Sequence, residues 1–213
     1  MDLSLLGRIA ASVVVGYLLG GISWALIVGK GFYKVDVREH GSGNLGATNV
    51  MRVLGWKAAA AVFVLDMAKG AVAVVLAGLL VPATMGAYAH QWTMILATLA
   101  AMAGHSFSPY LRFRGGKGVA TAAGALLVIV PLVWPVLLIS WIVMIAIWRM
   151  VSLGSVVIAV EFPVLVFFAY RGDWLLLGFA IVAGGLVVVR HSSNIARIVR
   201  GEEPRISLKR PSV

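Results

Sequence analysis

The chain has 213 residues, of which 61% are hydrophobic and only 12% charged, and its formal net charge is +10. Soluble domains carry about 25% charged residues, so this composition excludes an ordinary soluble protein and predicts an all-α, polytopic membrane protein. The sequence contains no cysteine, which excludes disulfides and thiolate chemistry. In a membrane protein, topology and anionic ligands explain the positive charge, and no nucleic-acid partner is expected.

Taken in chain order, the apolar segments predict seven membrane-spanning helices within a single domain, residues 1–213. The runs 118–149 and 156–190 are too long for one helix of about 20 residues. The first is interrupted by Pro131 and Pro135, and the second by the polar residues 171–173. Dividing both runs gives these predicted spans: 4–29, 57–81, 86–104, 118–133, 134–149, 154–170 and 173–190.

Most of the 18 Lys and Arg residues fall in segments that the seven-span arrangement places on one side of the membrane. The positive-inside rule puts that side in the cytoplasm, with the N-terminus outside and the C-terminus inside. A five-span arrangement gives the same ends but moves Arg149 and Ser152 to the outside, which disfavours it. The tail from Glu202 is expected to be polar and loosely ordered. The predicted cytoplasmic segments are 30–56, 105–117, 149–155 and 190–213.

Residues 105–121 are the most informative polar segment and read HSFSPYLRFRGGKGVAT. Glycines let backbone N–H groups approach an anion closely, and the start of the following helix adds positive potential. The segment is not a P-loop, because Leu111 stands where that pattern needs its first glycine and Gly118 follows Lys117. A loop that only sets topology is the alternative, and the glycine cluster favours an anion site at the membrane surface instead.

Two further segments on the same predicted side combine small or amide residues with basic ones. They read GSGNLGATNVMR at 41–52 and HSSNIARIVRGEE at 191–203. Gly41, Gly43 and Gly46 match G-x-G-x-x-G, but a membrane helix follows instead of a βαβ unit, so a dinucleotide site is not expected. Together the three segments favour a ligand that carries phosphate.

Other chemistries are disfavoured by what the sequence lacks. The scattered histidines and few carboxylates predict no metal site, and we expect no cofactor. No histidine is followed by aspartate at the fifth position, as it is in soluble glycerol-phosphate acyltransferases. Asp66 and Lys69, spaced i, i+3, share one face of a predicted span. They form either a structural ion pair or a support for the polar site.

A membrane transporter for a phosphorylated anion is the alternative function. Its path would need polar residues through the membrane, whereas the predicted outer loops 82–85 and 131–135 are short and almost uncharged. The sequence therefore favours an enzyme that uses an already activated donor.

The three segments, together with LDMAKG at 65–70 and RMVSLGS at 149–155, resemble the bacterial acyl-phosphate:glycerol-3-phosphate acyltransferase family. The resemblance covers nearly the whole chain in order. It implies transfer of a fatty acyl group from acyl phosphate to the sn-1 hydroxyl of glycerol 3-phosphate, giving lysophosphatidate and phosphate in the first acylation of bacterial phospholipid synthesis. It also implies location in the bacterial plasma membrane, a cytoplasmic active site and contact with membrane lipids, and no protein partner is evident.

The resemblance also implies roles for individual residues. The substrate phosphate would be bound by Lys117, Gly115, Gly116, Arg52 and Asn44. The catalytic positions would be His191, Asn194, Ser155 and Ser42. Supporting positions would be Asp66, Lys69, His105, Asn49, Arg149 and Glu202. The base is either His191 or a substrate phosphate, and the absence of an evident carboxylate to orient His191 favours the phosphate.

Overall fold

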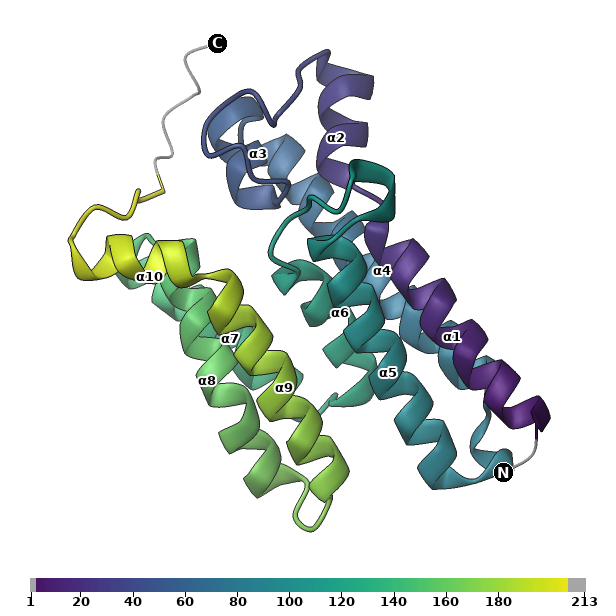
Figure 1. The fold of residues 1–213 in the computed structure, drawn as a ribbon. Helices are drawn as coiled ribbons and strands as arrows, with labels where there is room; N and C mark the ends of the chain where they lie inside the picture. The colour runs from purple at the N-terminus through teal and green to yellow at the C-terminus, as the bar shows by residue number, and fades with distance from the viewer. Residues whose placement is uncertain (1–2, 207–213) are drawn as a thin grey trace. The chain divides into compact units, whose positions relative to one another are not determined.

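A computed structural model describes residues 3–206, and the chain divides into two compact units, the first ending at Ile129 and the second beginning at Val130 (Figure 1). Both units are built from helices joined by turns, which confirms the predicted all-α class. The predicted C-terminal segment 190–213 is described as far as Ile206, and its remaining residues, with Lys209 and Arg210, lie outside the described part.

The first unit contains two of the three polar segments that the sequence marks, 41–52 and 105–121. Its elements are α1 Leu3–Gly21, α2 Trp24–Val28, the π-helix η1 Gly29–Tyr33, α3 Ala47–Leu54, α4 Trp56–Leu80, η2 Ala83–Met85, α5 Ala87–Ser106, η3 Pro109–Leu111 and α6 Val119–Ile129. Within it, α1, α4, α5 and α6 pack against one another, and α3 packs against α4.

The second unit is a group of three apolar helices with a short amphipathic one at its end. Its elements are α7 Trp134–Trp148, α8 Val151–Ala169, α9 Trp174–Arg190 and α10 Ser192–Val199. Helix α8 packs against both α7 and α9, and the rings of Phe162 and Phe179 meet edge-on with centroids 5.8 Å apart. Between α9 and α10 the chain bends by 62° at His191.

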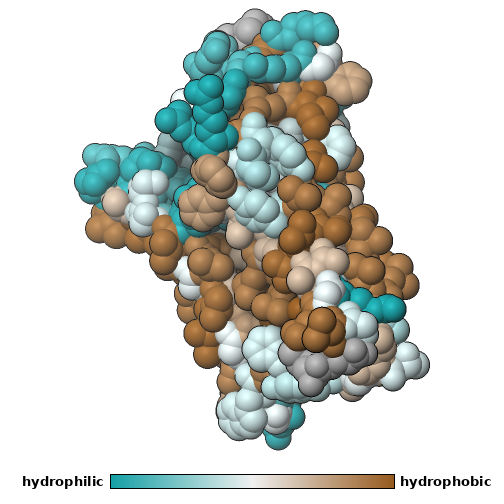
Figure 2. All heavy atoms as spheres, turned by 45° about the vertical axis from the view of Figure 1, so that its right-hand side comes forward, coloured by the Kyte–Doolittle hydropathy of each residue, from teal (hydrophilic) through white to brown (hydrophobic). Residues whose placement is uncertain are grey.

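Large apolar side chains lie exposed along these helices, as they do where lipid replaces water as the solvent. The face that carries α1 is largely hydrophobic along the helices, with hydrophilic residues gathered at one end (Figure 2). By length and composition, Leu3–Tyr33, Trp56–Leu80 and Val151–Ala169 each qualify as a span, and the bent pair formed by α9 and α10 makes a fourth if counted as one. Helices α6 and α7 are apolar but shorter.

The two long apolar runs are each divided into two helices, as the sequence predicts. Pro131 lacks a backbone N–H and restricts the residue before it, so α6 ends at Ile129, four residues earlier than expected. The second run breaks at Gly172, whose φ of +86° only glycine adopts readily. The first predicted span, 4–29, was expected to be continuous, but its helix is interrupted at residues 22–23.

Glycines let the helices of the first unit approach until backbones touch. A Cβ on Gly20 of α1 would collide with the carbonyl oxygen of Ala101 on α5, and one on Gly124 of α6 would collide with that of Met67 on α4. Small residues at such crossings are typical of helix packing in membranes, where close van der Waals contact replaces the hydrophobic effect as the driving force. These contacts position the ends of α4, α5 and α6, from which the polar loops emerge.

Candidate functional site

The loop before α3 is organised by one buried amide, Asn49. Its Nδ2 donates to the carbonyl oxygens of Val37 at 2.8 Å and His40 at 3.2 Å. Its Oδ1 accepts from the backbone N–H of Ser42 at 2.8 Å and from the Ser42 hydroxyl at 3.1 Å. Gly41, at φ +62°, has no room for a Cβ because Asn49 Oδ1 lies there. The loop is therefore held in one shape, and the position of Ser42 is fixed by Asn49.

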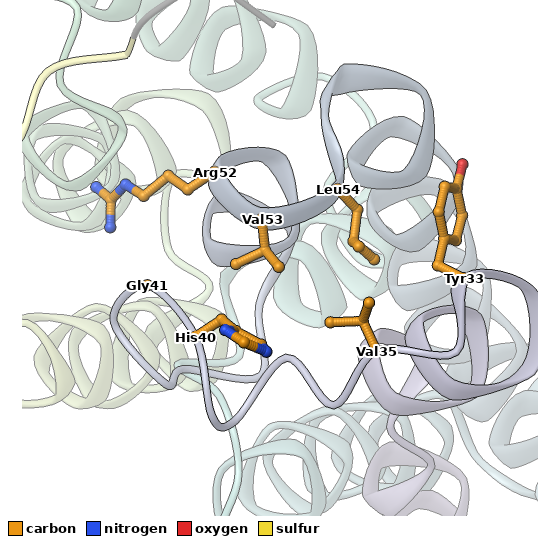
Figure 3. A pocket seen from close by; sticks show the side chains of 7 residues that line it. All are labelled: Tyr33, Val35, His40, Gly41, Arg52, Val53 and Leu54. Atoms are coloured by element: carbon orange, nitrogen blue, oxygen red, sulfur yellow. The ribbon is translucent and has the colours of Figure 1, made fainter. Parts of the chain in front are cut away.

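A cavity of about 460 Å³ lies between this loop and α3 (Figure 3). Its lining residues are Tyr33, Val35, His40, Gly41, Arg52, Val53 and Leu54. Arg52 stands in the last turn of α3 and extends away from the apolar side chains of Val53 and Leu54. The cavity thus combines an apolar wall with the cation that the sequence predicts to bind phosphate. Asn44, the other predicted phosphate-binding residue of this loop, is half-buried.

The Gly115–Gly116–Lys117 loop rests directly on the C-terminal end of α5. The backbone N–H of Gly116 donates to the carbonyl oxygen of His105 at 3.0 Å. A Cβ on Gly115 would collide with that same oxygen, and a Cβ on Gly116 with the His105 ring, so only glycine fits at either place. Lys117 follows, half-buried, and Gly118 at φ +80° leads into the N-terminus of α6. An ammonium and a helix N-terminus therefore come together beside a backbone that carries no side chain, which are features that favour an anion.

Beneath this loop lies a buried polar cluster centred on the Lys69 ammonium. Lys69 Nζ donates to Ile22 O at 2.6 Å and to His105 Nδ1 at 2.9 Å, and it pairs with Asp66 Oδ1 at 2.7 Å. The Lys69 and Asp66 side chains are only 3% and 2% exposed. Ile22 can accept this bond because the interruption after α1 frees its carbonyl from helical bonding. Both sequence interpretations of the pair thus apply: it is an ion pair, and it lies under the predicted phosphate loop.

The same cluster holds the His105 ring in place. Its Nδ1 lies 2.9 Å from Lys69 Nζ, 3.3 Å from Thr121 Oγ1 and 3.6 Å from Asp66 Oδ1. In the neutral ring Nδ1 accepts from the ammonium, because an ammonium can donate but cannot accept. The opposite edge of the ring, with Nε2, faces the Gly115–Gly116 backbone, since Nε2 lies where a Gly116 Cβ would be.

The second unit carries its own polar set, organised by Glu203. Its Oε1 accepts from Ser152 Oγ at 2.6 Å and from Asn194 Nδ2 at 2.7 Å, and its Oε2 accepts from Arg197 Nε at 2.8 Å. The Ile206 N–H donates to Arg149 O at 2.6 Å. Residues 202–206 are therefore anchored onto α8 and α10, in contrast to the loosely ordered tail that the sequence suggested.

Glu203 is the residue that sequence reasoning missed. Burial by itself would raise the pKa of its carboxyl, but the bonds from Ser152, Asn194 and Arg197 favour the ionised form and hold the pKa below its usual range. The predicted supporting residue, Glu202, is instead exposed and paired with Arg200. The spacing of Asn194 and Arg197 on one face of α10 was the available signal for a carboxylate partner.

His191 and Ser155 are both buried near this set. His191 Nδ1 donates to the carbonyl oxygen of Val187 at 2.8 Å, which places the ring proton on Nδ1 and leaves Nε2 as the accepting nitrogen of the neutral ring. Ser155 Oγ donates to Val151 O at 2.9 Å and accepts from Trp141 Nε1 at 3.4 Å. Arg149 ends α7 in the left-handed region, at φ +60°.

The predicted site residues thus form two sets, each described within its own unit. The first holds Ser42, Asn44, Asn49, Arg52, Asp66, Lys69, His105, Gly115, Gly116 and Lys117, and the second holds Arg149, Ser155, His191, Asn194 and Glu202. Within residues 3–206, no three His, Asp or Glu side chains cluster closely enough to hold a metal ion. The fold defines an all-helical integral membrane protein, with basic and small polar side chains gathered beside the ends of its helices.

Known sequences and structures identify this class more closely. A family model described as glycerol-3-phosphate acyltransferase matches residues 10–201. A glycerol-3-phosphate acyltransferase of Exiguobacterium sibiricum is 41% identical over 203 residues, covering 94% of this chain and 95% of that protein. One of Listeria welshimeri is 42% identical over 193 residues, covering 91% and 94%.

Two crystal structures of PlsY (YgiH), an integral membrane glycerol 3-phosphate acyltransferase, are similar in fold. Its glycerol 3-phosphate form has a TM-score of 0.83 at 35% identity and covers 93% of this chain and 96% of that one. Its lysophosphatidic acid form has a TM-score of 0.81 at 34% identity, covering 94% and 96%. The chain belongs to the glycerol-3-phosphate acyltransferase family of integral membrane enzymes.

Removing the buried ammonium should destabilise the first unit strongly. Lys69→Met leaves Asp66 as a buried charge without its cation, and we expect the free energy of unfolding to fall by about 3–5 kcal/mol. Thermal unfolding of the purified protein in detergent measures the change. The double variant Asp66→Asn/Lys69→Met removes both charges and should recover part of the loss. Equal stability of Lys69→Met and the wild type would contradict the assigned role.

Glu203→Gln should lower stability by about 1.5–3 kcal/mol at pH 7, because a charged acceptor of three hydrogen bonds becomes neutral. The pKa of Glu203 is lower in the folded protein than in the unfolded chain, so its carboxylate stabilises the fold at pH values above the ordinary glutamate pKa of about 4.3. This stabilisation is lost as the pH falls below that value and through the lower pKa of the folded state. Unfolding followed between pH 7 and 3 should show the gap between wild type and variant closing at the acid end. Glu202→Gln, at the exposed neighbour, is the control and should change little; a pH-independent gap would refute the assignment.

Proposed function

We propose that this chain transfers a fatty acyl group from acyl phosphate to the sn-1 hydroxyl of glycerol 3-phosphate, giving 1-acylglycerol 3-phosphate and phosphate. The hydroxyl oxygen attacks the acyl carbonyl carbon, the bond from that carbon to the phosphate oxygen breaks, and phosphate leaves with the electron pair. Family membership supports the acceptor and the reaction class. The observation that carries the proposal is the Gly115–Lys117 loop, which precedes α6 and lies directly against His105 of α5.

The chemistry suits an enzyme without a covalent nucleophile. Acyl phosphate is a mixed anhydride and already activated, so the main tasks are to hold two mutually repelling anions together and to stabilise the charge that develops on the carbonyl oxygen. Clustered cations and hydrogen-bond donors perform both tasks. Neither task needs a cofactor.

In the first unit, Lys117 and the Gly115 amide would bind the phosphate of glycerol 3-phosphate. Gly116, which the resemblance also implies, has its N–H bonded to the His105 carbonyl, so it would contribute by letting the phosphate approach a backbone without a side chain. Arg52 would bind a phosphate from the side of α3, with Asn44 donating a hydrogen bond. The Ser42 hydroxyl donates to Asn49 Oδ1 here, and it would turn from that acceptor to the substrate on binding. The rigid connections to Asn49 and to the Lys69 cluster support this assignment, because groups held in place lose little entropy when the substrate binds.

In the second unit, Ser155, His191 and Asn194 would contact the donor or the glycerol hydroxyls. We assign the hydroxyl proton to a substrate phosphate, whose second pKa is about 6. His191 is only 3% exposed, and an imidazole that accepted the proton would become a buried cation at a cost in desolvation. In this assignment His191, oriented by Val187 O, acts as a hydrogen-bonding partner of the substrates.

We also propose the membrane arrangement on the basis of charge. Seven spans, with the N-terminus outside, place the loops 30–56, 105–117 and 149–155 in the cytoplasm of a bacterial cell, where glycerol 3-phosphate would be bound. The spans too short to cross as helices alone, α6 and α7, would be accommodated by local thinning of the bilayer. Acyl chains would enter from the surrounding lipid.

The donor assignment is tested with purified protein, glycerol 3-phosphate and palmitoyl phosphate, following lysophosphatidate by mass spectrometry and phosphate release. Product is expected from acyl phosphate and not from acyl-CoA or an acyl carrier protein thioester. Lys117→Ala should lower kcat/KM by about 10²-fold or more, because a charge-assisted phosphate contact is lost. Lys57→Ala, at an exposed lysine, is the control.

Product from a thioester alone would overturn the donor assignment while keeping the acyltransferase. If no donor gave product from folded protein, while vesicles containing it accumulated labelled glycerol 3-phosphate, the transport alternative would replace the enzyme.

His191→Gln separates the two candidate bases. If a substrate phosphate takes the proton, the variant should retain turnover within about tenfold at saturating substrate, and the acid limb of the kcat–pH profile should persist. A histidine base predicts a loss of about 10²–10⁴-fold together with disappearance of that limb. Steady-state kinetics between pH 5 and 9 distinguish the two bases. A large loss of turnover together with loss of the acid limb would make His191 the base.

A further inference from the structure

A second cationic pocket lies in the first unit, and the residues that line it are not among those assigned to the reaction. It has a volume of about 430 Å³ and is lined by Arg38, Tyr110, Leu111, Arg112 and Arg114. None of these residues lines the cavity beside Arg52, and neither Lys117 nor any predicted catalytic residue lines this pocket.

Two of the three arginines of this pocket have no partner among the residues that the structure describes. The third, Arg38, is held by Asp36, which accepts from its Nε at 2.9 Å and from its second guanidinium nitrogen at 2.6 Å. Lys30 pairs with the same carboxylate at 2.8 Å, so the three groups together keep one positive charge. Within residues 3–206, the Arg112 and Arg114 side chains make no hydrogen bond or ion pair. Two guanidinium groups are therefore available to an anion from outside.

The backbone that carries these two arginines is held in a defined shape. Arg112 and Phe113 are both left-handed, at φ +52° and +59°, a conformation that residues other than glycine rarely adopt. Hydrogen bonds to the Ser108 carbonyl from Phe113 N, at 2.9 Å, and to the Leu111 carbonyl from Arg114 N, at 3.1 Å, close the turn. Ser108 Oγ ties it to Gly21 O at 2.6 Å. A strained turn that is fastened in this way presents its side chains in fixed directions.

Exposed aromatic rings accompany the arginines. Phe107, Tyr110 and Phe113 are 47%, 58% and 66% exposed. They stand at every third position after the end of α5. Aromatic side chains at the end of a membrane helix are typical of the interfacial layer, where lipid headgroups lie. Tyr110 and Leu111 also give the pocket an apolar part, which a small hydrophilic phosphate does not need.

We propose that this pocket binds the phosphate of an anionic phospholipid headgroup, with Arg112 and Arg114 as its ligands and the neighbouring aromatic rings against the upper acyl chain. Planar guanidinium groups match phosphate geometry. Because Arg114 directly precedes Gly115, a lipid bound here fastens the start of the Gly115–Lys117 loop to the membrane surface. The pocket is thus a lipid site separate from the reaction.

Native mass spectrometry of the detergent-purified protein, titrated with phosphatidylglycerol or phosphatidylcholine, tests the proposal independently of activity. The wild type should bind phosphatidylglycerol saturably and more tightly than phosphatidylcholine. Arg112→Gln/Arg114→Gln should weaken phosphatidylglycerol binding about tenfold or more and leave phosphatidylcholine binding unchanged. The control Lys57→Gln/Arg205→Gln removes two exposed positive charges outside the pocket and should bind as the wild type does.

If the control variant bound phosphatidylglycerol as weakly as the arginine variant does, the lipid would be attracted by the net charge of the protein alone, and the proposed site would be overturned. Displacement of the lipid by millimolar glycerol 1-phosphate would overturn it in favour of a soluble phosphate ligand. A second measurement uses only the wild-type protein, so its outcome does not depend on whether a variant folds. Phosphatidylglycerol with a photoreactive acyl chain, crosslinked to this protein, should label peptides containing residues 107–114. Labelling confined to other segments would refute the proposal.

Discussion

One buried ammonium holds the first unit's polar site in place. Lys69 has acceptors from three segments: the Ile22 carbonyl after α1, Asp66 on its own helix α4, and His105 near the end of α5. A buried cation is tolerated only when such partners surround it, so the ends of these helices cannot move independently. The Gly115–Gly116 backbone lies on His105, and its position follows from the same contacts.

The two units use the same principle with different chemistry. Asn49 in the first and Glu203 in the second each join a segment that lacks regular structure to a helix, and each is buried with all of its side-chain oxygens accepting hydrogen bonds. A polar group of this kind strongly favours the one loop conformation that satisfies it, because any other leaves a buried acceptor without a donor. Loops rich in glycine are thereby made rigid without becoming apolar.

The sequence was sufficient for features that depend on local pattern. Apolar runs indicated the helices, and Pro131 and the residues around Gly172 indicated where two runs divide. Features that depend on distant partners could not be predicted in this way. The interruption at Ile22 is stabilised by a lysine that follows it by 47 residues. Glu203 is buried and its neighbour Glu202 is not, because of how the tail folds back onto Ser152.

The order of residues in the Lys69 cluster has a consequence for biogenesis. Ile22 and Asp66 precede Lys69 in the chain, whereas His105 follows it, so a chain inserted from the N-terminus presents two of the three acceptors before α5 is made. Helix α4 therefore enters the bilayer as a neutral pair of opposite charges one turn apart, already facing the carbonyl left open at the end of α1. The Gly115–Lys117 loop is therefore added to helices whose polar contacts have already begun to form, because α1 and α4 both precede it in the chain.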